Sequence, residues 1–398
     1  MNDLLLTDCT LVDVVSGSNV PDAAIAIAGG RIAAAGPRAA VPSQAAATIE
    51  LDGAHVLPGL INCHVHFGLV LPGAEGERLR GETEAARALR MAANARATLQ
   101  AGVTTVRLVG EEPYADIALR ASIRRGETVG PRVLCSGPLL VATGGHGWEL
   151  PGTREANGAD GFRHAVREHV KHGVDWVKIS VSGGIAGENE AIADAQMTHD
   201  EIAAVTDAAH ARRRKVAAHA GPAGAIATAV ELGVDTIEHG YFLTDEVAEL
   251  LVRHGAWLVP TINVSRAVAF FEKIGAPEWM IARALAAGEL HWAALQSAIR
   301  AGVRIAMGTD MMPSEPFDGT SVTVREIEFM VEAGMAPVDA LRAATCRAAE
   351  MLGLEGTVGS IAPGLAADVI AVGASPLDDV SALRDLRLVV AAGAVMPR

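Results

Sequence analysis

Cysteines, aromatic side chains and clusters of basic residues are all scarce in this sequence. Its 398 residues include four cysteines, which stand far apart and form no CxxC pair, so neither a disulfide framework nor a thiolate zinc site is indicated. Aromatic residues make up only 4% of the chain, and the formal net charge is -14. Because this net negative charge gives no attraction for a phosphate backbone, nucleic acid is not an expected partner.

Long apolar runs are also missing. No stretch is long and apolar enough to cross a bilayer, so we expect no membrane partner. The N-terminal segment lacks a basic start, and Asp3, Thr7 and Asp8 interrupt its apolar run, so it does not resemble a signal peptide. Isolated cysteines favour a reducing compartment. We therefore expect a cytoplasmic protein.

Apolar residues and glycine, by contrast, are abundant. Half of the residues are hydrophobic and 42 are glycine, which suits one large α/β domain with many tight turns. The first 54 residues are predicted to form short strands, with a hairpin turn at Gly29 and Gly30. From His55 onward, apolar strand-like runs alternate with alanine-rich helical stretches, a pattern typical of βαβ units around a parallel sheet.

Eight strands are predicted in the alternating region. They cover residues 55–62, 104–109, 132–139, 175–180, 215–219, 235–239, 256–261 and 303–309. We interpret residues 55–354 as a (β/α)8 TIM-like barrel. The competing architecture is a doubly wound open sheet, which normally carries a glycine-rich phosphate turn after an early strand, and no such turn is present. Residues 1–54 and 355–398 are expected to meet in one small β-sandwich beside the barrel.

The first metal-binding candidate is the HxH motif of His64 and His66. Side chains two apart in a strand point the same way, so both imidazoles can meet one ion. The chain has 13 histidines, and a motif this short can arise by chance. Its position gives it weight, because this fold places catalytic groups at the carboxyl ends of the barrel strands.

Three later strand ends carry further metal-binding side chains, namely His219, His239 and Asp310. The alternatives are a buried histidine satisfied by the backbone and, for Asp310, a helix cap. Lys178 ends another predicted buried strand, where an unpaired ammonium is costly to desolvate. Its alternative is an ion-paired or snorkelling lysine. Because these side chains recur at the same place on successive strands, together they predict a metal site at the mouth of the barrel.

These residues resemble those of the amidohydrolase superfamily. The match runs nearly end to end, through HVLPGLINCHVHFG, DWVKISVSGG, KVAAHA, DTIEHG, MGTDM and AATCRAAEMLGLEGTVGSIAPGLAADVIAV. Within the superfamily the chain is most similar to the imidazolonepropionase-like and prolidase-like branch, through ATGGHG at 142–147, KISVSGG at 178–184 and IEHGY at 237–241.

The resemblance implies a site with two divalent metal ions, for which zinc is expected. It implies that His64, His66 and Asp310 hold the first ion, that His219 and His239 hold the second, and that Lys178, carboxylated by CO2, bridges them. By the same analogy, His146 and Tyr241 contact substrate, and Tyr241 polarises the scissile carbonyl. The alternatives for these two are a loop-stabilising histidine and a half-buried tyrosine. One departure is Asn62, where many family members carry aspartate.

The implied reaction is cleavage of the C-N amide bond of a dipeptide or N-acyl amino acid by a metal-bridging hydroxide. Asp310 would take the water proton and deliver it to the leaving amine. A mononuclear deaminase or cyclic amidase, a hydrolase of carbamates, phenylureas or aryl amides, and a non-catalytic scaffold remain alternatives. The intact ligand set argues against the scaffold.

The predicted partners are a small-molecule substrate and further copies of the chain in a homo-oligomer. Arg154 and Arg266 are candidates for binding a substrate carboxylate, since arginine binds carboxylates bidentately. Candidates for contact with an apolar group are Phe270, Phe271, Trp279 and Met280.

Overall fold

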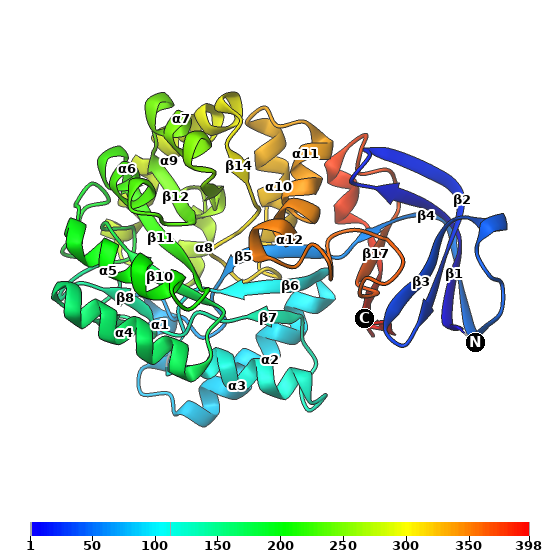
Figure 1. The fold of residues 1–398 in the computed structure, drawn as a ribbon, viewed down its shortest axis with the longest axis horizontal. Helices are drawn as coiled ribbons and strands as arrows, with labels where there is room; N and C mark the ends of the chain where they lie inside the picture. The colour runs from blue at the N-terminus through cyan, green and yellow to red at the C-terminus, as the bar shows by residue number, and fades with distance from the viewer. Residues whose placement is uncertain (1, 112, 398) are drawn as a thin grey trace.

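A seven-stranded sheet contains both ends of the chain in the computed structural model, which describes residues 2–111 and 113–397. Its strands are β1 (Asn2–Asp13), β2 (Ser18–Ala28), β3 (Arg31–Pro37), β4 (Ala45–Pro58), β17 (Val369–Val372), β18 (Leu386–Ala391) and β19 (Ala394–Val395), in the order β19-β18-β17-β4-β1-β2-β3. The predicted hairpin turn joins β2 to β3, where Gly29 and Gly30 both have positive φ. Figure 1 shows this sheet beside the larger α/β part of the molecule.

Parallel strands form the centre of the α/β part. A three-stranded sheet contains β5 (Leu60–Val65), β6 (Val103–Leu108) and β7 (Arg132–Leu134). A second sheet contains β8 (Leu139–Val141), β9 (Thr153–Glu155), β10 (Trp176–Ser180), β11 (Lys215–Pro222), β12 (Thr236–Phe242), β13 (Trp257–Val259) and β14 (Arg304–Ile305), in the order β14-β13-β12-β11-β10-β8-β9. All neighbours in both sheets pair in parallel. A short antiparallel pair, β15 (Pro316–Phe317) and β16 (Thr320–Ser321), lies outside them.

Backbone hydrogen bonds connect the two parallel sheets at two places. The N–H of Cys63 in β5 donates to the carbonyl of Met307, just after β14, at 2.8 Å. The N–H of Trp176 in β10 donates to the carbonyl of Cys135, just after β7, at 3.1 Å. The parallel strands are therefore linked along both sides of the three-stranded sheet.

Helices surround these parallel strands (Figure 1). They are α1 (Ala74–Leu79), α2 (Glu84–Gln100), α3 (Ala115–Arg124), α4 (Gly158–His172), α5 (His199–His210), α6 (Ala223–Glu231), α7 (Asp245–His254), α8 (Val268–Lys273), α9 (Glu278–Ala301), α10 (Val322–Glu332), α11 (Pro337–Ala343) and α12 (Cys346–Leu352). Glycines in the left-handed conformation end four of them, at Gly173, Gly255, Gly302 and Gly353. Within the described residues, no helix is long and apolar enough to cross a membrane.

The strand predicted over residues 55–62 is divided in the structure. β4 ends at Pro58 as part of the terminal sheet, and β5 begins at Leu60 as part of the parallel strands. Between them, the N–H of Gly59 donates to the carbonyl of Asp368 at 2.9 Å, and a Cβ at this position would collide with Thr104. This close approach therefore requires glycine. The chain passes from the terminal sheet to the parallel strands at this residue.

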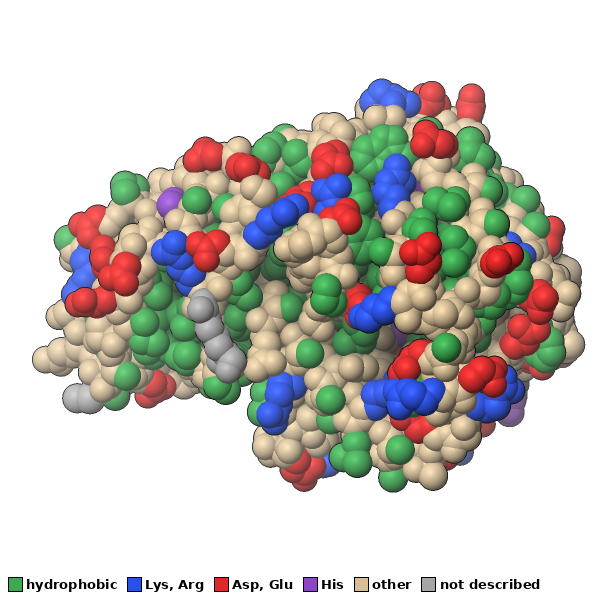
Figure 2. All heavy atoms as spheres, turned by 180° about the vertical axis from the view of Figure 1, so that it is seen from behind, with side chains coloured by type: hydrophobic (Ala, Val, Ile, Leu, Met, Phe, Trp, Pro, Cys, Tyr) green, Lys and Arg blue, Asp and Glu red, His purple; other side chains and the backbone are tan. Residues whose placement is uncertain are grey.

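Acidic and basic side chains are mixed over one face of the molecule (Figure 2). Figure 2 shows one face, on which blue and red side chains alternate and no continuous basic patch forms. This distribution agrees with the excess of 47 acidic over 33 basic residues and offers no counterpart to a nucleic-acid backbone on that face.

Candidate active site

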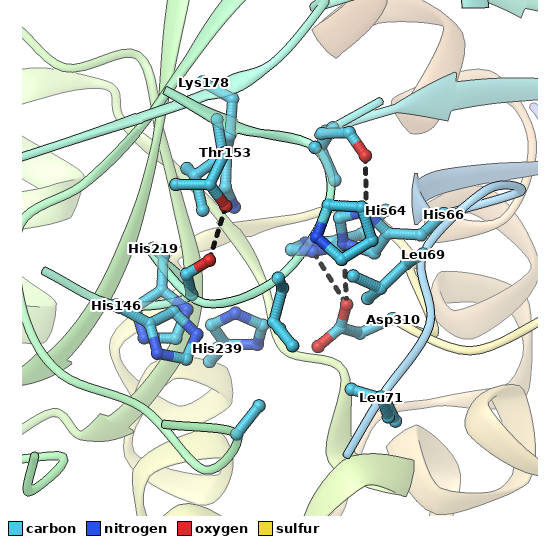
Figure 3. Close-up of a pocket in the computed structure, with 18 residues that line it drawn as sticks. His64, His66, Leu69, Leu71, His146, Thr153, Lys178, His219, His239 and Asp310 are labelled. Atoms are coloured by element: carbon cyan, nitrogen blue, oxygen red, sulfur yellow. Dashed lines mark hydrogen bonds and ion pairs between the residues drawn. The ribbon is translucent and has the colours of Figure 1, made fainter. Parts of the chain in front are cut away.

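All six residues predicted as metal ligands line one cavity at the carboxyl ends of the parallel strands. They are His64, His66, Lys178, His219, His239 and Asp310. Figure 3 shows the cavity, with His64, His66 and Asp310 on one side and His146 and His219 on the other. The structure therefore brings together residues that are up to 246 positions apart in the sequence, His64 and Asp310 being the extremes.

The side chains of His64, His239 and Asp310 form the tightest group. Each offers one ligand atom, and these atoms lie within 4.8 Å of one another. The Nε2 atoms of His64 and His66 are both 3.1 Å from Oδ1 of Asp310. The rings of His219 and His239 are 4.5 Å apart, so His219 adjoins the group. Imidazole nitrogens and a carboxylate oxygen in this arrangement are the donors that zinc and similar ions prefer.

The protonation states of this group suit metal binding. Burial lowers the pKa values of His219 and His239 well below their usual range, so both are neutral imidazoles. Burial alone would raise the pKa of Asp310, but the adjacent His64 and His66 hold it well below its usual range. His219 and His239 thus present neutral nitrogens and Asp310 an ionised carboxylate, the forms in which these side chains bind metals. Burial alone would lower the pKa of His66, but the adjacent Asp310 raises it.

Lys178 is a buried amine without a hydrogen-bond partner among the described residues. Its side chain extends from β10 into the cavity (Figure 3), and only 2% of the residue is exposed. Burial lowers the pKa of Lys178 to about 8, against the opposing attraction of Glu238 and Asp310. An unpartnered buried amine is costly, so its position among possible metal-binding donors calls for a functional explanation.

A charged pair lies beneath His64. The Nδ1 atom of His64 is 2.7 Å from Oε2 of Glu238, and Nη2 of Arg107 donates to Oε1 of the same carboxylate at 2.7 Å. Because a carboxylate only accepts hydrogen bonds, Nδ1 of His64 is the donor, and Nε2 faces Asp310 at the position where it could bind a metal. Arg107 also donates from Nε to the carbonyl of Cys63 at 2.6 Å, and both charged side chains are fully buried. Burial would raise the pKa of Glu238, but Arg107 and Lys178 hold it far below its usual range.

His239, in β12, contacts a residue of strained backbone and has strained backbone itself. Its Nδ1 atom is 2.7 Å from the hydroxyl of Thr261, which follows β13. The backbones of His239, Thr261 and Asp310 all have positive φ, at 68°, 52° and 54°. Left-handed backbone is uncommon in residues other than glycine and is concentrated at functional sites, where the surrounding structure has to enforce it.

Backbone carbonyls fix the other two histidines. Nδ1 of His66 is 3.2 Å from the carbonyl of Gly110, and Nε2 of His219 is 3.0 Å from the carbonyl of Gly183. Since a carbonyl only accepts, each of these nitrogens is the donor, and the opposite nitrogen of His66 faces Asp310. Asn62, which departs from the family pattern, accepts from the N–H of His64 and donates to Thr309 at 2.8 Å, so it ties the strand of His64 to the segment of Asp310.

His146 and Tyr241 also lie at the cavity. The ring of His146 stacks on His219 with centroids 4.1 Å apart, and its Nδ1 is 2.5 Å from a carboxylate oxygen of Glu190. Tyr241 stacks on His239 at 5.1 Å and lines a neighbouring part of the cavity. Burial raises the pKa of Tyr241 well above its usual range, so it carries its hydroxyl proton and can donate a hydrogen bond.

The two arginines suggested as carboxylate partners lie elsewhere. Arg154 forms an ion pair with Glu168. The guanidinium of Arg266 lies over the ring of Trp292, 4.5 Å from its centroid. Neither is among the residues that line the cavity. Of the four side chains suggested for apolar contact, Phe270, Phe271 and Met280 line the cavity, whereas Trp279 does not and instead packs against Arg283.

Sequence reasoning missed the residues that support the ligands, above all Arg107, Glu238 and Thr261. A signal for the first two was present, because each is a charged residue inside a predicted buried strand and therefore needs a partner. Their opposite charges made them natural partners for one another. Thr261 had no such signal, since a threonine at a strand end is common.

Comparisons with known proteins identify the relatives of this chain. The model of the amidohydrolase family matches residues 55–395. The ochratoxinase of Aspergillus niger is 29% identical over 94% of this chain and 82% of its own length, and the imidazolonepropionase of Cutibacterium acnes is 28% identical over 93% and 89%. The solved structure of a Xaa-Pro dipeptidase with methionine in its active site superposes with a TM-score of 0.88 at 32% identity, covering 98% of this chain and 99% of that one.

Proposed function

The chain belongs to the amidohydrolase family, in its imidazolonepropionase-like and prolidase-like branch, and we propose that it is a binuclear metal-dependent enzyme that cleaves dipeptides or N-acyl amino acids. That it is a hydrolase of carbon-nitrogen amide bonds follows from the family and from its similarity to ochratoxinase, imidazolonepropionase and Xaa-Pro dipeptidase. The binuclear site and the substrate class are the parts that we propose.

The observation that carries the proposal is Lys178, a buried and unpartnered amine between the two groups of histidines. We assign His64, His66 and Asp310 to one divalent ion and His219 and His239 to the other, with Lys178 carboxylated by CO2 as the bridge, and we expect both ions to be zinc. A pKa lowered to about 8 provides a fraction of neutral amine at neutral pH, the form that reacts with CO2. Carboxylation would also replace an uncompensated buried cation by a ligand.

The bound ions would supply a water of lowered pKa and polarise the scissile carbonyl. Asp310 accepts the proton of this water at its free carboxylate oxygen and delivers it to the nitrogen of the leaving amine, acting first as base and then as acid. His146 and Tyr241 contact the substrate, and the hydroxyl of Tyr241 donates to the carbonyl oxygen on which negative charge develops.

A finer description of the fold belongs to the same proposal. We infer that eight of the ten parallel strands of residues 55–354, β5–β7 and β10–β14, close as a barrel, which the backbone bonds from Cys63 and Trp176 support. Residues 1–54 and 355–398 would form a sandwich, which a shared apolar cluster containing Leu6, Ile25 and Val369 supports. We also expect a homo-oligomer, which light scattering would reveal.

A mononuclear deaminase or cyclic amidase is the second candidate. It is favoured by the group of His64, His239 and Asp310, in which three ligand atoms suffice for a single ion. In that case Lys178 would remain uncarboxylated.

Metal analysis of the purified protein, combined with an assay of N-acyl amino acids and dipeptides, tests the proposal. We expect about two zinc ions per chain, hydrolysis that a chelator abolishes, and loss of turnover in Asp310→Asn while metal remains bound. One ion per chain would favour the mononuclear enzyme, and a chain unable to take up metal would favour a scaffold. Full turnover by Asp310→Asn would overturn the proton-transfer role, and hydrolysis of lactones alone would overturn the amidase.

A further inference from the structure

We propose that the cavity has an apolar lobe that binds an uncharged aliphatic or aromatic group of the substrate, adjacent to the scissile amide. The lobe is lined by Ile185, Ala186, Val264, Phe270, Phe271 and Met280. This inference rests on the proposed function and defines the substrate class further: amides with a bulky apolar substituent, either in the acyl group or in the amino-acid side chain.

The apolar lobe opens directly onto the candidate ligands. His219, Tyr241 and Asp310 line it together with the apolar side chains, and the cavity volume is about 50 Å³. A substrate whose carbonyl lies near Asp310 therefore has its neighbouring substituent in or beside the lobe. The lining comes from four different segments, namely the loop after β10, the turn of residues 262–265, α8 and α9. Apolar lining with a few convergent polar groups is typical of small-molecule sites.

The residues that line the lobe disfavour a charged group of a substrate. Besides Asp310 and the histidines, no charged side chain lines it among the residues described, and neither lysine nor arginine is present. The nearby Arg283 is engaged with the carbonyls of Gly184 and Ile185, each 3.3 Å from Nη1. A carboxylate placed among these apolar side chains would be desolvated with no lysine or arginine in the lining to pair with it, which opposes binding.

The alternative is that these side chains merely pack the core. Phe271 and Met280 are nearly fully buried, at 3% and 1% exposure, as core residues are. Ordinary core packing leaves few voids larger than a water molecule, whereas these side chains border a space that is continuous with the candidate ligands. Phe270 is only partly buried and borders both the lobe and an outer cavity formed with α1 and α2, so it stands at the entrance.

Two substrate series test the lobe with zinc-loaded protein. In the first, the acyl group of an N-acyl amino acid is lengthened from acetyl to hexanoyl, and adipoyl provides a charged counterpart of hexanoyl. In the second, the acyl group is constant and the amino-acid side chain varies from alanine to norleucine and phenylalanine, with glutamate as the charged counterpart. We expect kcat/KM in one series to rise up to about fourfold per added methylene, equivalent to about 0.8 kcal/mol, and to fall at least tenfold for the charged compound.

Variants at the entrance assign the effect to the lobe. We expect Phe270→Ala to weaken the dependence on apolar length and Phe270→Arg to reduce the discrimination against the charged compound, with metal content unchanged. Leu285→Ala, on the exposed side of α9, is the matched control and should behave like the unmodified protein. Equal rates across both series, or faster hydrolysis of the charged compounds, would overturn the apolar lobe while leaving the amidase standing. A failure of every compound would instead contradict the proposed function.

Discussion

Beneath the candidate ligands, the strands carry one buried ion pair, Arg107 with Glu238, whereas the apolar lobe above is lined, among the described residues, by no lysine or arginine. The floor, defined here by Arg107, Glu238 and Thr261, fixes the ring nitrogens of His64 and His239 through hydrogen bonds of 2.7 Å. The wall, defined by the residues of the apolar lobe, contacts the space above the site. The floor therefore orients the ligands, and the wall selects what reaches them.

This division predicts where mutations act. Changes in the floor should alter stability and metal affinity even when they do not touch the substrate. Changes in the wall should alter substrate preference and leave the metal in place. Each of the following experiments either contradicts this division of roles between floor and wall or defines it more closely.

The largest effect is expected from Arg107→Met. It leaves Glu238 buried without its cation, and removing one partner of a buried pair costs about 3 to 5 kcal/mol of unfolding free energy. Denaturant unfolding measures this loss. Arg253→Met removes an exposed arginine paired with Glu249, and we expect a change within about 0.5 kcal/mol for this control. Equal unfolding free energies of the two variants would show that the pair of Arg107 with Glu238 does not stabilise the fold.

A smaller effect is expected from Glu238→Gln. The amide keeps the shape but no longer offers His64 an acceptor-only partner, so the tautomer with a free Nε2 is less favoured. We expect zinc affinity to fall about 10- to 100-fold, measured by competition with a chelator. In the double variant with Arg107→Met the two losses of stability should not add, because each removes the same pair. Additive losses would contradict this coupling.

Thr261 should contribute about tenfold to metal affinity, at the lower end of the same range. Thr261→Val removes the hydroxyl that bonds His239 and keeps the side-chain volume, so zinc should bind more weakly. Thr261→Ser keeps the hydroxyl and is the matched rescue. If valine and serine affect zinc binding equally, the role of Thr261 lies in its backbone, whose φ is 52°, and not in its hydroxyl.

The contrast between floor and wall also explains what the sequence could predict. The candidate ligands His64, His219 and Asp310 were predicted because parallel strands bring their carboxyl ends to one edge. A regular alternation of strands and helices is therefore enough to bring these three side chains together. Alternation of strands and helices likewise predicted the parallel sheets, and an apolar contact from Phe270 was suggested by its place in the loop after the seventh predicted strand.

What the sequence could not predict depends on contacts across the fold. The hydrogen bond of Thr261 to His239 and the pair of Arg107 with Glu238 join residues 22 and 131 positions apart, and no local pattern specifies such partners. The division of the strand at Gly59 follows from its approach to Thr104, which also depends on packing. Arg154 and Arg266 were suggested from residue type, but their charges are engaged by Glu168 and Trp292 away from the cavity.

The smallest effect concerns Glu326, which supports the wall from α10. Its carboxylate oxygens accept from the N–H groups of Ile262 and Asn263, in the turn that carries Val264 of the lobe. Burial raises the pKa of Glu326 from 4.5 to about 8, although these N–H groups oppose the rise. Because the folded chain holds this proton more tightly than the unfolded chain, the stabilisation is complete below about pH 4.5 and is lost as the pH rises to about 8.

Glu326→Gln tests this because glutamine cannot titrate. Between pH 7 and 8 we expect the unmodified protein to lose at most about 1.4 kcal/mol of unfolding free energy relative to the variant, and the difference to become constant above pH 9. Any effect of pH on metal binding is common to both proteins and cancels in the difference. Zinc affinity should be the same in both, because Glu326 contacts no ligand side chain. If the unfolding free energies of the two proteins change with pH in parallel, Glu326 is not neutral in the folded chain. Weaker zinc binding in the variant would show that the wall also positions the metal.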